Sequence, residues 1–312
     1  MKLVSSVLFI LILISSAFGD CGFSLTTPVL NYTATDLNPA LSQSFSLYRH
    51  SGGPQCDNVV VGFSRGGSAT YARKATNILN GATVSYNIYK ESTALTELRK
   101  QIDATSSNQV ITGTISRKET KNLDYFFKLG LLTSGIVTRA GTYSDTIQVE
   151  ASEGAFTDGA IPEVTQPFLV NIVVPTSISI SLVDSGSPHD TSSTSKVLDF
   201  GELVENKELG FDVRIVSNAG YNLSVSSANN QKLQLLGAPE NISNQISYDF
   251  YAANGLKNLT SSSAGAVSIG TGPGSTPAEG AIVPIRVVIK SVDNKNSGNY
   301  NDYVTFTVIT TE

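Results

Sequence analysis

Few side chains in this sequence have the type and spacing that catalysis requires. Gly62-Phe63-Ser64-Arg65-Gly66 satisfies the G-x-S-x-G pattern of a nucleophile elbow, which holds a serine on a strand-turn-helix of an α/β sheet. Such a serine needs a histidine as its base, and only His189 follows it, in a loop rich in Ser, Thr and Asp. We interpret the motif as a glycine-rich hairpin turn and predict that the protein is not an enzyme.

A tyrosine and an aspartate occur twice as a pair that could serve as a general acid and a general base. Gly141-Thr142-Tyr143-Ser144-Asp145 and Gly298-Asn299-Tyr300-Asn301-Asp302 share the pattern Gly-x-Tyr-x-Asp. On a strand, residues two apart lie on the same face. Because the pair stands in both copies of a repeat, we expect a shared structural role, such as a corner hydrogen bond, rather than catalysis.

Metal ligands are also scarce. Asp293-Asn294-Lys295-Asn296-Ser297-Gly298 has some likeness to a calcium loop, but Lys295 occupies a ligand position and Val304 stands where a bidentate glutamate belongs. We interpret this segment as a polar hairpin turn in which Gly298 supplies a positive φ. The sequence predicts no metal site and no cofactor.

The first residues, 1–19, are predicted to be a secretory signal peptide. Lys2 provides the positive charge, Val7–Ile14 the apolar region, and Ala17-Phe18-Gly19 the cleavage site. A lipid anchor on Cys21 is disfavoured because Asp20 immediately before it is the wrong residue type for that processing. No other stretch approaches the roughly 18 to 20 consecutive apolar residues that span a bilayer. We therefore predict an exported protein with no membrane span.

Charge and cysteine content narrow the partners and the compartment. A net charge of −5 and a pI near 5.2 argue against nucleic acid, because binding to phosphates needs clustered Lys and Arg. The only cysteines are Cys21 and Cys56, and an oxidising compartment favours their pairing. A metal site at these cysteines lacks ligands, since His50 and His189 are the only histidines and are expected in different domains.

A repeat shows how these residues are positioned. One sequence pattern occurs twice: in Val84–Tyr89 followed by Gly141–Asp145, and in Ile246–Tyr251 followed by Gly298–Asp302. Apolar residues alternate with polar ones through most of the chain, which is typical of strands with one buried face. Helical spacing is rare, and its best examples are Leu95, Leu98 and Ile102, and Tyr71, Ala75, Ile78 and Leu79. The sequence predicts an all-β protein of two tandem domains.

The boundary between the domains is expected near Pro167. Glu153–Gln166 is rich in Gly, Pro, Asp and Glu and has the composition of a linker or surface loop. This boundary gives domains of residues 20–166 and 167–312. The second domain would then open with a long strand that carries Val170, Ile172 and Val174, and Ser261–Gly280 would be a solvated loop.

Several short segments of the second domain resemble the spore coat protein U domain, the fold of archaic (Csu-type) chaperone-usher pili. They are Val197–Leu203, Asn218–Ser227 and Gly298–Asp302. The first domain matches more loosely, through Cys21, Cys56, Tyr71-Ala72-Arg73, Tyr86–Tyr89 and Gly141–Asp145. The resemblance implies two immunoglobulin-like β-sandwich domains in tandem, the second lacking its final strand. The second domain departs from many members of the family because it has no cysteine.

In that family the neighbouring subunit donates a strand that fills the open groove of the sandwich. The resemblance implies an acceptor groove in the second domain, formed by two sets of strand residues: Val170, Ile172 and Val174, and Val304, Phe306 and Val308. It also implies three partners, a periplasmic chaperone, an outer-membrane usher and an adjacent pilin subunit. The protein would pass through the periplasm and end outside the cell.

The ends of the chain indicate its place in such a fibre. Cys21, tied to Cys56, leaves little free N-terminal sequence to donate, and the second copy of the repeat ends one strand after its Gly-x-Tyr-x-Asp signature. A subunit that only accepts a strand belongs at the tip, so we expect a pilus tip adhesin active in attachment or biofilm. A secreted spore-coat or cell-surface protein is the alternative, and a secreted hydrolase explains the sequence least.

The first domain would make the adhesive contact. An apolar stretch with glycines offers Leu131, Leu132, Ile136 and Val137, and a run of aromatics offers Tyr125 and Phe126. Both stretches can also be core strands, although three consecutive aromatics cannot all face one core. The ligand stays open between an abiotic surface, a glycan and a host protein.

Overall fold

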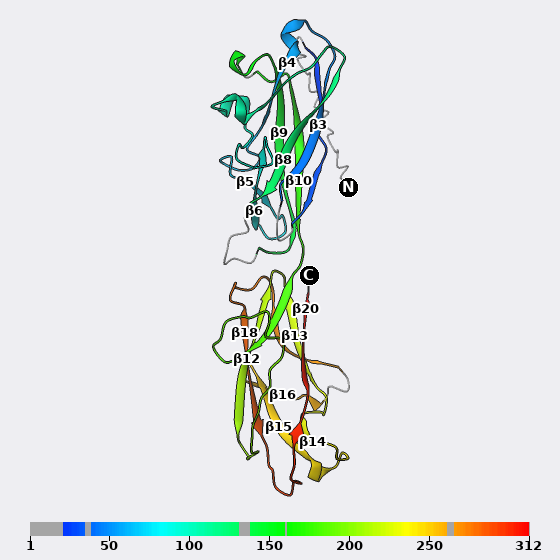
Figure 1. The fold of residues 1–312 in the computed structure, drawn as a ribbon, viewed down its shortest axis with the longest axis vertical. Coiled ribbons are helices and arrows are strands. Elements are labelled where there is room, and N and C mark those ends of the chain that lie inside the picture. Colours follow the sequence, from blue (N-terminus) through cyan, green and yellow to red (C-terminus); the bar gives the residue numbers. More distant parts are fainter. Residues whose placement is uncertain (1–20, 35–38, 131–137, 160, 261–264, 312) are drawn as a thin grey trace, which may run out of the picture. The chain divides into compact units, whose positions relative to one another are not determined.

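The structure is a computed structural model that describes residues 21–34, 39–130, 138–159, 161–260 and 265–311, and the regular secondary structure of these residues is almost entirely β-strand (Figure 1). Contacts divide the described residues into two units, one within 21–130 and 143–172, the other within 138–142 and 173–311. Within the described residues the helices are single 3₁₀ turns, and none is long and apolar enough to cross a membrane. The all-β prediction is confirmed.

The first unit is one hydrogen-bonded sheet of ten strands. The order of hydrogen-bonded neighbours is β1-β3-β8-β6-β5-β9-β10-β2, and β4 pairs with both β7 and β9. The strands are β1 (Phe23–Thr26), β2 (Leu30–Thr33), β3 (Leu41–Arg49), β4 (Asn58–Phe63), β5 (Arg73–Thr76), β6 (Thr83–Tyr89), β7 (Ile111–Thr114), β8 (Thr120–Leu129), β9 (Gly141–Glu153) and β10 (Val164–Val174).

Aromatic rings from four strands form the centre of the first unit. The Phe63 ring of β4 lies 5.9 Å from Phe45 of β3 and 5.7 Å from Tyr125 of β8, measured between centroids. Tyr125 in turn makes an edge contact with Phe168 of β10 at 5.7 Å. Because aromatic side chains bury the largest apolar area per residue, these contacts hold β10 in the core of the first unit.

The domain boundary and the linker differ from those expected from the sequence. β9 continues to Glu153, β10 begins at Val164, and the Glu163 N–H donates to the Ala151 carbonyl at 2.9 Å. The residues between the two strands therefore connect neighbouring strands of the first unit. Gly and Pro are equally suited to hairpin connections and to linkers, so composition alone did not separate the two cases. The structure places the boundary after Ile172 rather than near Pro167.

The second unit contains two sheets. One has the order β11-β12-β18-β15-β14-β19 with β16 beside β15, and the other has the order β17-β13-β20. The strands are β11 (Ile178–Val183), β12 (Glu208–Ser217), β13 (Tyr221–Ser227), β14 (Lys232–Leu235), β15 (Gln245–Ala252), β16 (Gly255–Lys257), β17 (Val267–Gly272), β18 (Ala281–Ile289), β19 (Tyr300–Asn301) and β20 (Val304–Thr310).

β17 lies inside the segment Ser261–Gly280 that the sequence predicted to be a solvated loop. Its apolar residue Val267 pairs with Val225 of β13, and Ile269 is buried. Only two alternating apolar residues stand between serines and glycines there, and so short a pattern is hidden by turn-forming neighbours. The solvated-loop prediction is wrong for β17.

The two units repeat one topology. In both, five strands follow one another in the same spatial order: β1, β3, β8, β6 and β5 in the first unit, and β11, β12, β18, β15 and β14 in the second. β9 of the first unit corresponds to β19 with β20, because β9 begins with the Gly-x-Tyr-x-Asp signature and β19 lies within its second copy. The prediction of two tandem immunoglobulin-like sandwiches is confirmed.

Candidate functional site

In each unit, the tyrosine-containing strand of the repeat is hydrogen-bonded to the aspartate of the Gly-x-Tyr-x-Asp segment. The Tyr86 hydroxyl donates to Asp145 Oδ2 at 2.7 Å, and in the second unit Tyr248 donates to Asp302 Oδ2 at the same distance. Each aspartate also accepts from a backbone N–H at 3.0 Å, of Gly67 and of Asn229 respectively. The expected corner hydrogen bond is present, but its donor is the tyrosine of a distant strand rather than Tyr143 or Tyr300.

This arrangement explains the G-x-S-x-G motif without catalysis. Gly66 has a φ of +65°, and a Cβ there would lie 2.1 Å from Asp145 Oδ2. The Ser64 hydroxyl accepts the N–H groups of Gly66 at 3.3 Å and Gln148 at 2.8 Å. The motif therefore forms a turn that seats Asp145, whereas a nucleophile would need a histidine beside Ser64.

The buried tyrosines predict a loss of stability in alkali. Burial raises the pKa of both Tyr86 and Tyr248. The neighbouring negative charge, of Asp145 for Tyr86 and of Asp302 for Tyr248, raises each pKa further. Above pH ~10 the unfolded chain ionises these hydroxyls and the folded chain does not, so stability present below pH ~10 falls by about 1.4 kcal/mol per pH unit for each tyrosine. Tyr86→Phe should make the decline for the first unit shallower by that amount in calorimetry between pH 10 and 11.

The matched variant Tyr248→Phe should change only the second unit. At pH 7 each variant also loses a hydrogen bond to a charged partner, worth about 1.5 to 3 kcal/mol. An unchanged alkaline slope in both variants would show that these tyrosines ionise equally in the folded and unfolded chain.

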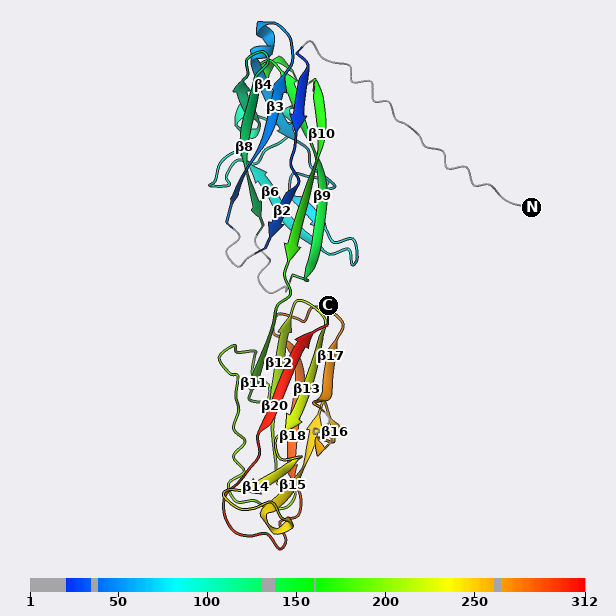
Figure 2. The same ribbon diagram turned by 90° about the vertical axis from the view of Figure 1, so that its right-hand side faces the viewer.

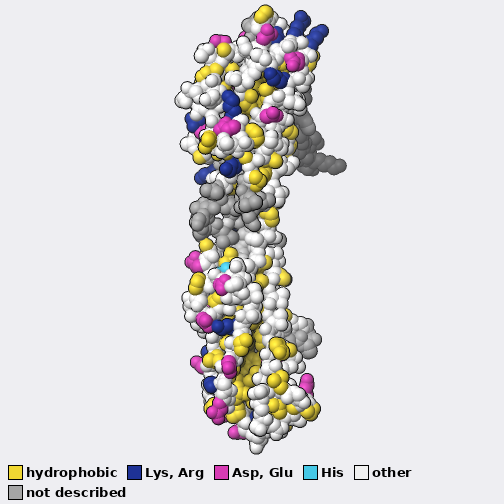
Figure 3. Space-filling view, viewed as in Figure 1, with side chains coloured by type: hydrophobic (Ala, Val, Ile, Leu, Met, Phe, Trp, Pro, Cys, Tyr) yellow, Lys and Arg dark blue, Asp and Glu magenta, His cyan; other side chains and the backbone are white. Residues whose placement is uncertain are grey.

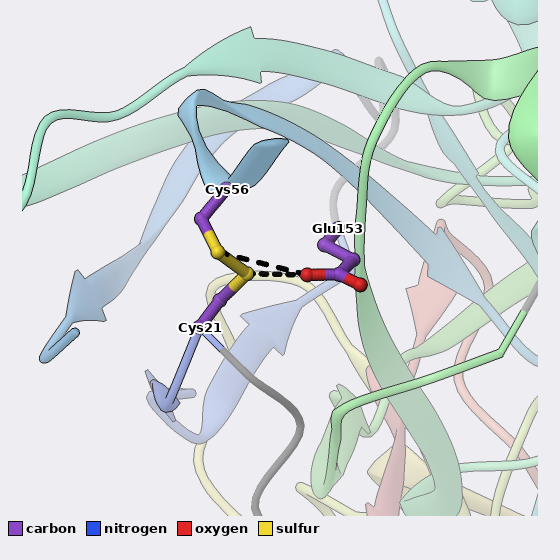
Figure 4. Close-up of side chains that lie close together, drawn as sticks. All are labelled: Cys21, Cys56 and Glu153. Carbon is purple, nitrogen blue, oxygen red and sulfur yellow. Dashed lines mark hydrogen bonds between the residues drawn. A yellow bond between two sulfur atoms is a disulfide. The ribbon is translucent and has the colours of Figure 1, made fainter. Parts of the chain in front are cut away.

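Cys21 and Cys56 form a disulfide with a Cα–Cα distance of 5.5 Å, as their compartment predicted. Both residues are fully buried, and Figure 4 shows the Glu153 carboxylate pointing toward the two sulfur atoms. These three side chains are close enough to share a metal ion. Zinc binds cysteine as the thiolate, so the paired sulfurs do not provide that donor set.

The residues predicted for surface contact divide into three groups. Leu131, Leu132, Ile136 and Val137 lie outside the described residues. Tyr125 is 1% exposed, so the expectation that it contacts a surface is wrong, because its side chain faces the aromatic core. Phe126 points to the opposite face of β8 and is partly exposed.

A different turn of the first unit presents apolar side chains to solvent. Ile78 and Leu79 are both 91% exposed between β5 and β6. Asn77 holds the turn: its side-chain oxygen accepts the Leu79 N–H at 2.9 Å and its carbonyl accepts the Gly81 N–H at 2.8 Å. The sequence pattern suggested a helical face here, whereas the structure shows a turn whose two adjacent exposed apolar residues make it a candidate contact surface.

Two of the edge strands in the described part of the second unit, β11 and β20, leave apolar side chains partly exposed. Among the described residues, β11 pairs only with β12 and β20 only with β13. Their inward side chains pack on the core yet stay partly exposed: Ile178, Ile180 and Leu182 on β11, and Val304, Phe306 and Val308 on β20. Figure 3 shows hydrophobic side chains gathered in a strip on this unit. We call the space between these edges the open groove.

The first unit fills the equivalent position with its own chain. β10 lies between β9 and β2, and its side chains Phe168, Val170 and Ile172 are at most 1% exposed. Val170 and Ile172 are therefore core residues of the first unit and do not line a groove of the second, and Val174, at the end of the same strand, is also buried. The sequence assigned them to the second domain because it placed the boundary before this strand.

Comparison with known families gives the following matches. The model of the Spore Coat Protein U domain matches residues 16–150. This match falls mainly on the first unit and covers less than half of the chain. The resemblance noted in the sequence was stronger in the second domain, whereas the spore coat protein U match lies on the first. A search of curated proteins finds no match.

Two solved structures align with nearly the whole chain at low identity. One is the CsuC–CsuE chaperone–tip adhesion subunit complex from archaic chaperone-usher Csu pili of Acinetobacter baumannii, with 13% identity, 91% of this chain and 99% of that chain covered, and a TM-score of 0.41. The other is the CupB6 tip adhesin from Pseudomonas aeruginosa, with 11% identity, 92% and 94% covered, and a TM-score of 0.44.

Proposed function

We propose that this protein is a subunit of an archaic chaperone-usher pilus that accepts a strand in its second unit and carries an adhesive first unit at the fibre tip. One observation supports the acceptor role above all. The open groove of the second unit stands where β10 stands in the first, with six apolar side chains left half-buried. Filling it would add backbone hydrogen bonds to both edges and bury those side chains.

The partners in this proposal are a periplasmic chaperone, an outer-membrane usher and the next pilin subunit. Fully burying an exposed apolar side chain contributes about 1.5 to 3 kcal/mol, and side chains that start half-buried gain about half of that. Six of them together therefore approach the stability of a whole domain, which is about 5 to 15 kcal/mol. An exposed groove of this kind also invites aggregation. A chaperone is therefore needed until the next subunit arrives.

The acceptor role is tested by adding synthetic peptides that copy the N-terminal segments of candidate shaft subunits. A peptide that docks in the open groove raises the melting temperature of the second unit, because it binds only the folded state. The first unit, already filled by β10, serves as the internal control and should not shift. If no peptide raises the transition, and the second unit alone unfolds cooperatively and stays soluble, strand acceptance is contradicted.

We assign the adhesive contact to the first unit, with the turn of Ile78 and Leu79 as its apolar part. Replacing both by serine should reduce retention of the protein on polystyrene beads several-fold, because two side chains that are 91% exposed lose their apolar area. The melting temperature should stay constant, since neither side chain belongs to the core. Leu256→Ser, at an exposed position of the second unit, is the matched control and should retain full binding.

A further inference from the structure

A cleft of about 490 Å³ lies in the first unit, beside the end of β6. Its lining residues come from two loop segments, 89–99 and 106–109. Figure 2 shows β6, the strand that ends at Tyr89, within the sheet of the first unit. Small-molecule sites have volumes of about 300 to 1,000 Å³, so the cleft has the size of a ligand site. It contains none of the residues assigned above to surface contact.

Glu97 and Arg99, the two charged residues of the cleft, are connected to the core by a chain of hydrogen bonds. Arg73 is 0% exposed and donates to the Leu98 carbonyl at 2.7 Å and to the side-chain oxygen of Asn87. The Asn87 amide donates to Glu97 Oε2 at 2.8 Å, and the other carboxylate oxygen of Glu97 accepts from Arg99. Because each group fixes the next, the charged pair is preorganised for a ligand.

One side of the cleft is a strained loop. Ala94 has a φ of +56°, in the left-handed region that residues with a Cβ seldom adopt. The Glu91 carboxylate maintains this turn, because its Oε1 accepts the N–H groups of Leu95 at 3.1 Å and Thr96 at 2.6 Å. Strained backbone persists where the surrounding structure enforces it, and it clusters at ligand sites. The loop is therefore a fixed wall of the cleft.

Several polar groups of the cleft have no partner within the described part of the chain. Arg99 exposes 30% of its side-chain surface, yet its buried Nε makes no hydrogen bond to a described residue. The same holds for the exposed Asn108 amide and for the hydroxyl of the partly exposed Tyr89. A buried donor without an acceptor is costly, so these groups gain from a ligand that brings oxygen atoms to them.

The lining indicates the chemical class of that ligand. Glu97 and Arg99 carry opposite charges, as do Lys90 and Glu91 beside the cleft, so it favours neither anions nor cations. Its polar groups are unsuited to a purely apolar molecule. The hydroxyls of a neutral saccharide both donate and accept, as a neighbouring carboxylate and guanidinium require. The C–H groups of a sugar ring also suit the electron-rich face of an aromatic ring such as Tyr89.

We propose that the cleft binds a neutral saccharide, with Glu97 and Arg99 as the hydrogen-bonding pair and Tyr89 as the ring that covers one face of the sugar. For its use in attachment, this inference rests on the adhesive role proposed for the first unit. The binding itself needs neither a fibre nor an incoming strand, so the full chain alone is sufficient for the measurement. The turn of Ile78 and Leu79 is a separate contact, because neither residue lines the cleft.

The test is binding of the full chain to a defined panel of sugars. An array carries neutral oligosaccharides that end in mannose, galactose, glucose, fucose or N-acetylglucosamine, beside sialylated and sulfated ones. The neutral oligosaccharide that binds best is then titrated in free form by calorimetry, and we expect a Kd of about 1 mM or tighter. Binding only to sialylated or sulfated members would overturn the inference in favour of an anion site. Binding to no member, or to the zwitterion glycine alone, would also overturn it.

A blocking variant places the sugar in the cleft. Ser106 is an exposed lining residue whose side chain caps no helix, so Ser106→Trp should leave the thermal transition of the first unit unchanged. The bulky ring should weaken sugar binding about tenfold or more, because it occupies the space of the ligand. Ser92→Trp, at an exposed position that does not line the cleft, is the matched control and should bind fully. Equal affinity of these two variants would mean that the sugar binds elsewhere.

Asn108→Ala and Arg99→Gln test the hydrogen bonds. Each should weaken binding, Arg99→Gln by about tenfold or more because it removes charge-assisted bonds. Asn108 contacts no described residue through its side chain, so its variant should also keep the parent's thermal transition. Asn58→Ala, exposed and outside the cleft, is the matched control. Parent-like affinity in both Arg99→Gln and Asn108→Ala would contradict the assignment of these groups to the ligand.

The double variant Ile78→Ser, Leu79→Ser separates the cleft from the adhesive turn. It should keep full sugar affinity, whereas Arg99→Gln should keep full retention on polystyrene beads. If no sugar binds while bead retention depends on the turn, the proposed adhesive role stands and the saccharide site is excluded. If a sugar binds in the cleft while the turn has no effect on bead retention, the saccharide site stands and the role of the turn is excluded.

Discussion

Val170→Asp is expected to unfold the first unit, whereas Val308→Asp is expected to leave the second unit folded. Val170 is 0% exposed on β10, and a carboxylate without a partner in such a site costs several kcal/mol, close to the whole stability of a domain. Val308 lies half-buried at the open groove, where the new carboxylate keeps contact with water. Calorimetry of the full chain should show that the first variant loses the transition of the first unit only.

The same two variants also distinguish a sandwich that is already closed from one that accepts a strand. Val308→Asp, although folded, should no longer gain stability from any peptide that docks in the open groove, because the inserted strand would bury its charge. Val308→Thr is the matched control, since it removes little volume and carries no charge. If Val170→Asp and Val308→Asp each abolish the thermal transition of their own unit, the apolar side chains of the second unit are as fully covered as those of the first.

Loss of the disulfide is expected to have the second largest effect. Cys21 and Cys56 are 35 residues apart, and on the chain-entropy model a crosslink of that length contributes about 3 to 4 kcal/mol. The double variant Cys21→Ser, Cys56→Ser should therefore melt well below the parent in the first unit, by about 10 °C or more. Adding a reductant to the parent chain should reproduce the shift.

The second unit is the internal control for this experiment. It has no cysteine, so neither the double variant nor the reductant should move its transition. A matched loss in both units would mean that they do not unfold independently. No loss in the first unit would show that the unfolded chain is already compact around this loop.

The comparison between sequence and structure is clearest at β10. Its alternating apolar residues predicted a long strand correctly, but alternation does not say which sheet a strand joins. Phe168 contacts Tyr125 from a strand far away in the sequence, and that contact decides the membership of β10. Proline and glycine before the strand fit a linker and a hairpin connection equally well, so the boundary was misplaced.

Asp145 and Asp302 give a second example. Their repetition indicated a structural role, and the Tyr-containing strands were recognised as the other half of the repeat. The pairing of Tyr86 with Asp145 and of Tyr248 with Asp302 became visible only when β6 and β15 were placed in their sheets. Side-chain partners that are more than fifty residues apart have no local signal, whereas each strand has one.

Period-two alternation, the repeated signature and two cysteines were enough to determine from the sequence an all-β fold, two tandem domains and a disulfide, because each rests on local spacing or on composition. The tertiary structure alone decided which unit contains β10 and that, among the described strands, β11 and β20 each have a neighbour on one side only. The reason is physical: a strand pattern specifies which side chains are buried, whereas hydrogen bonds between distant strands specify which edges are closed.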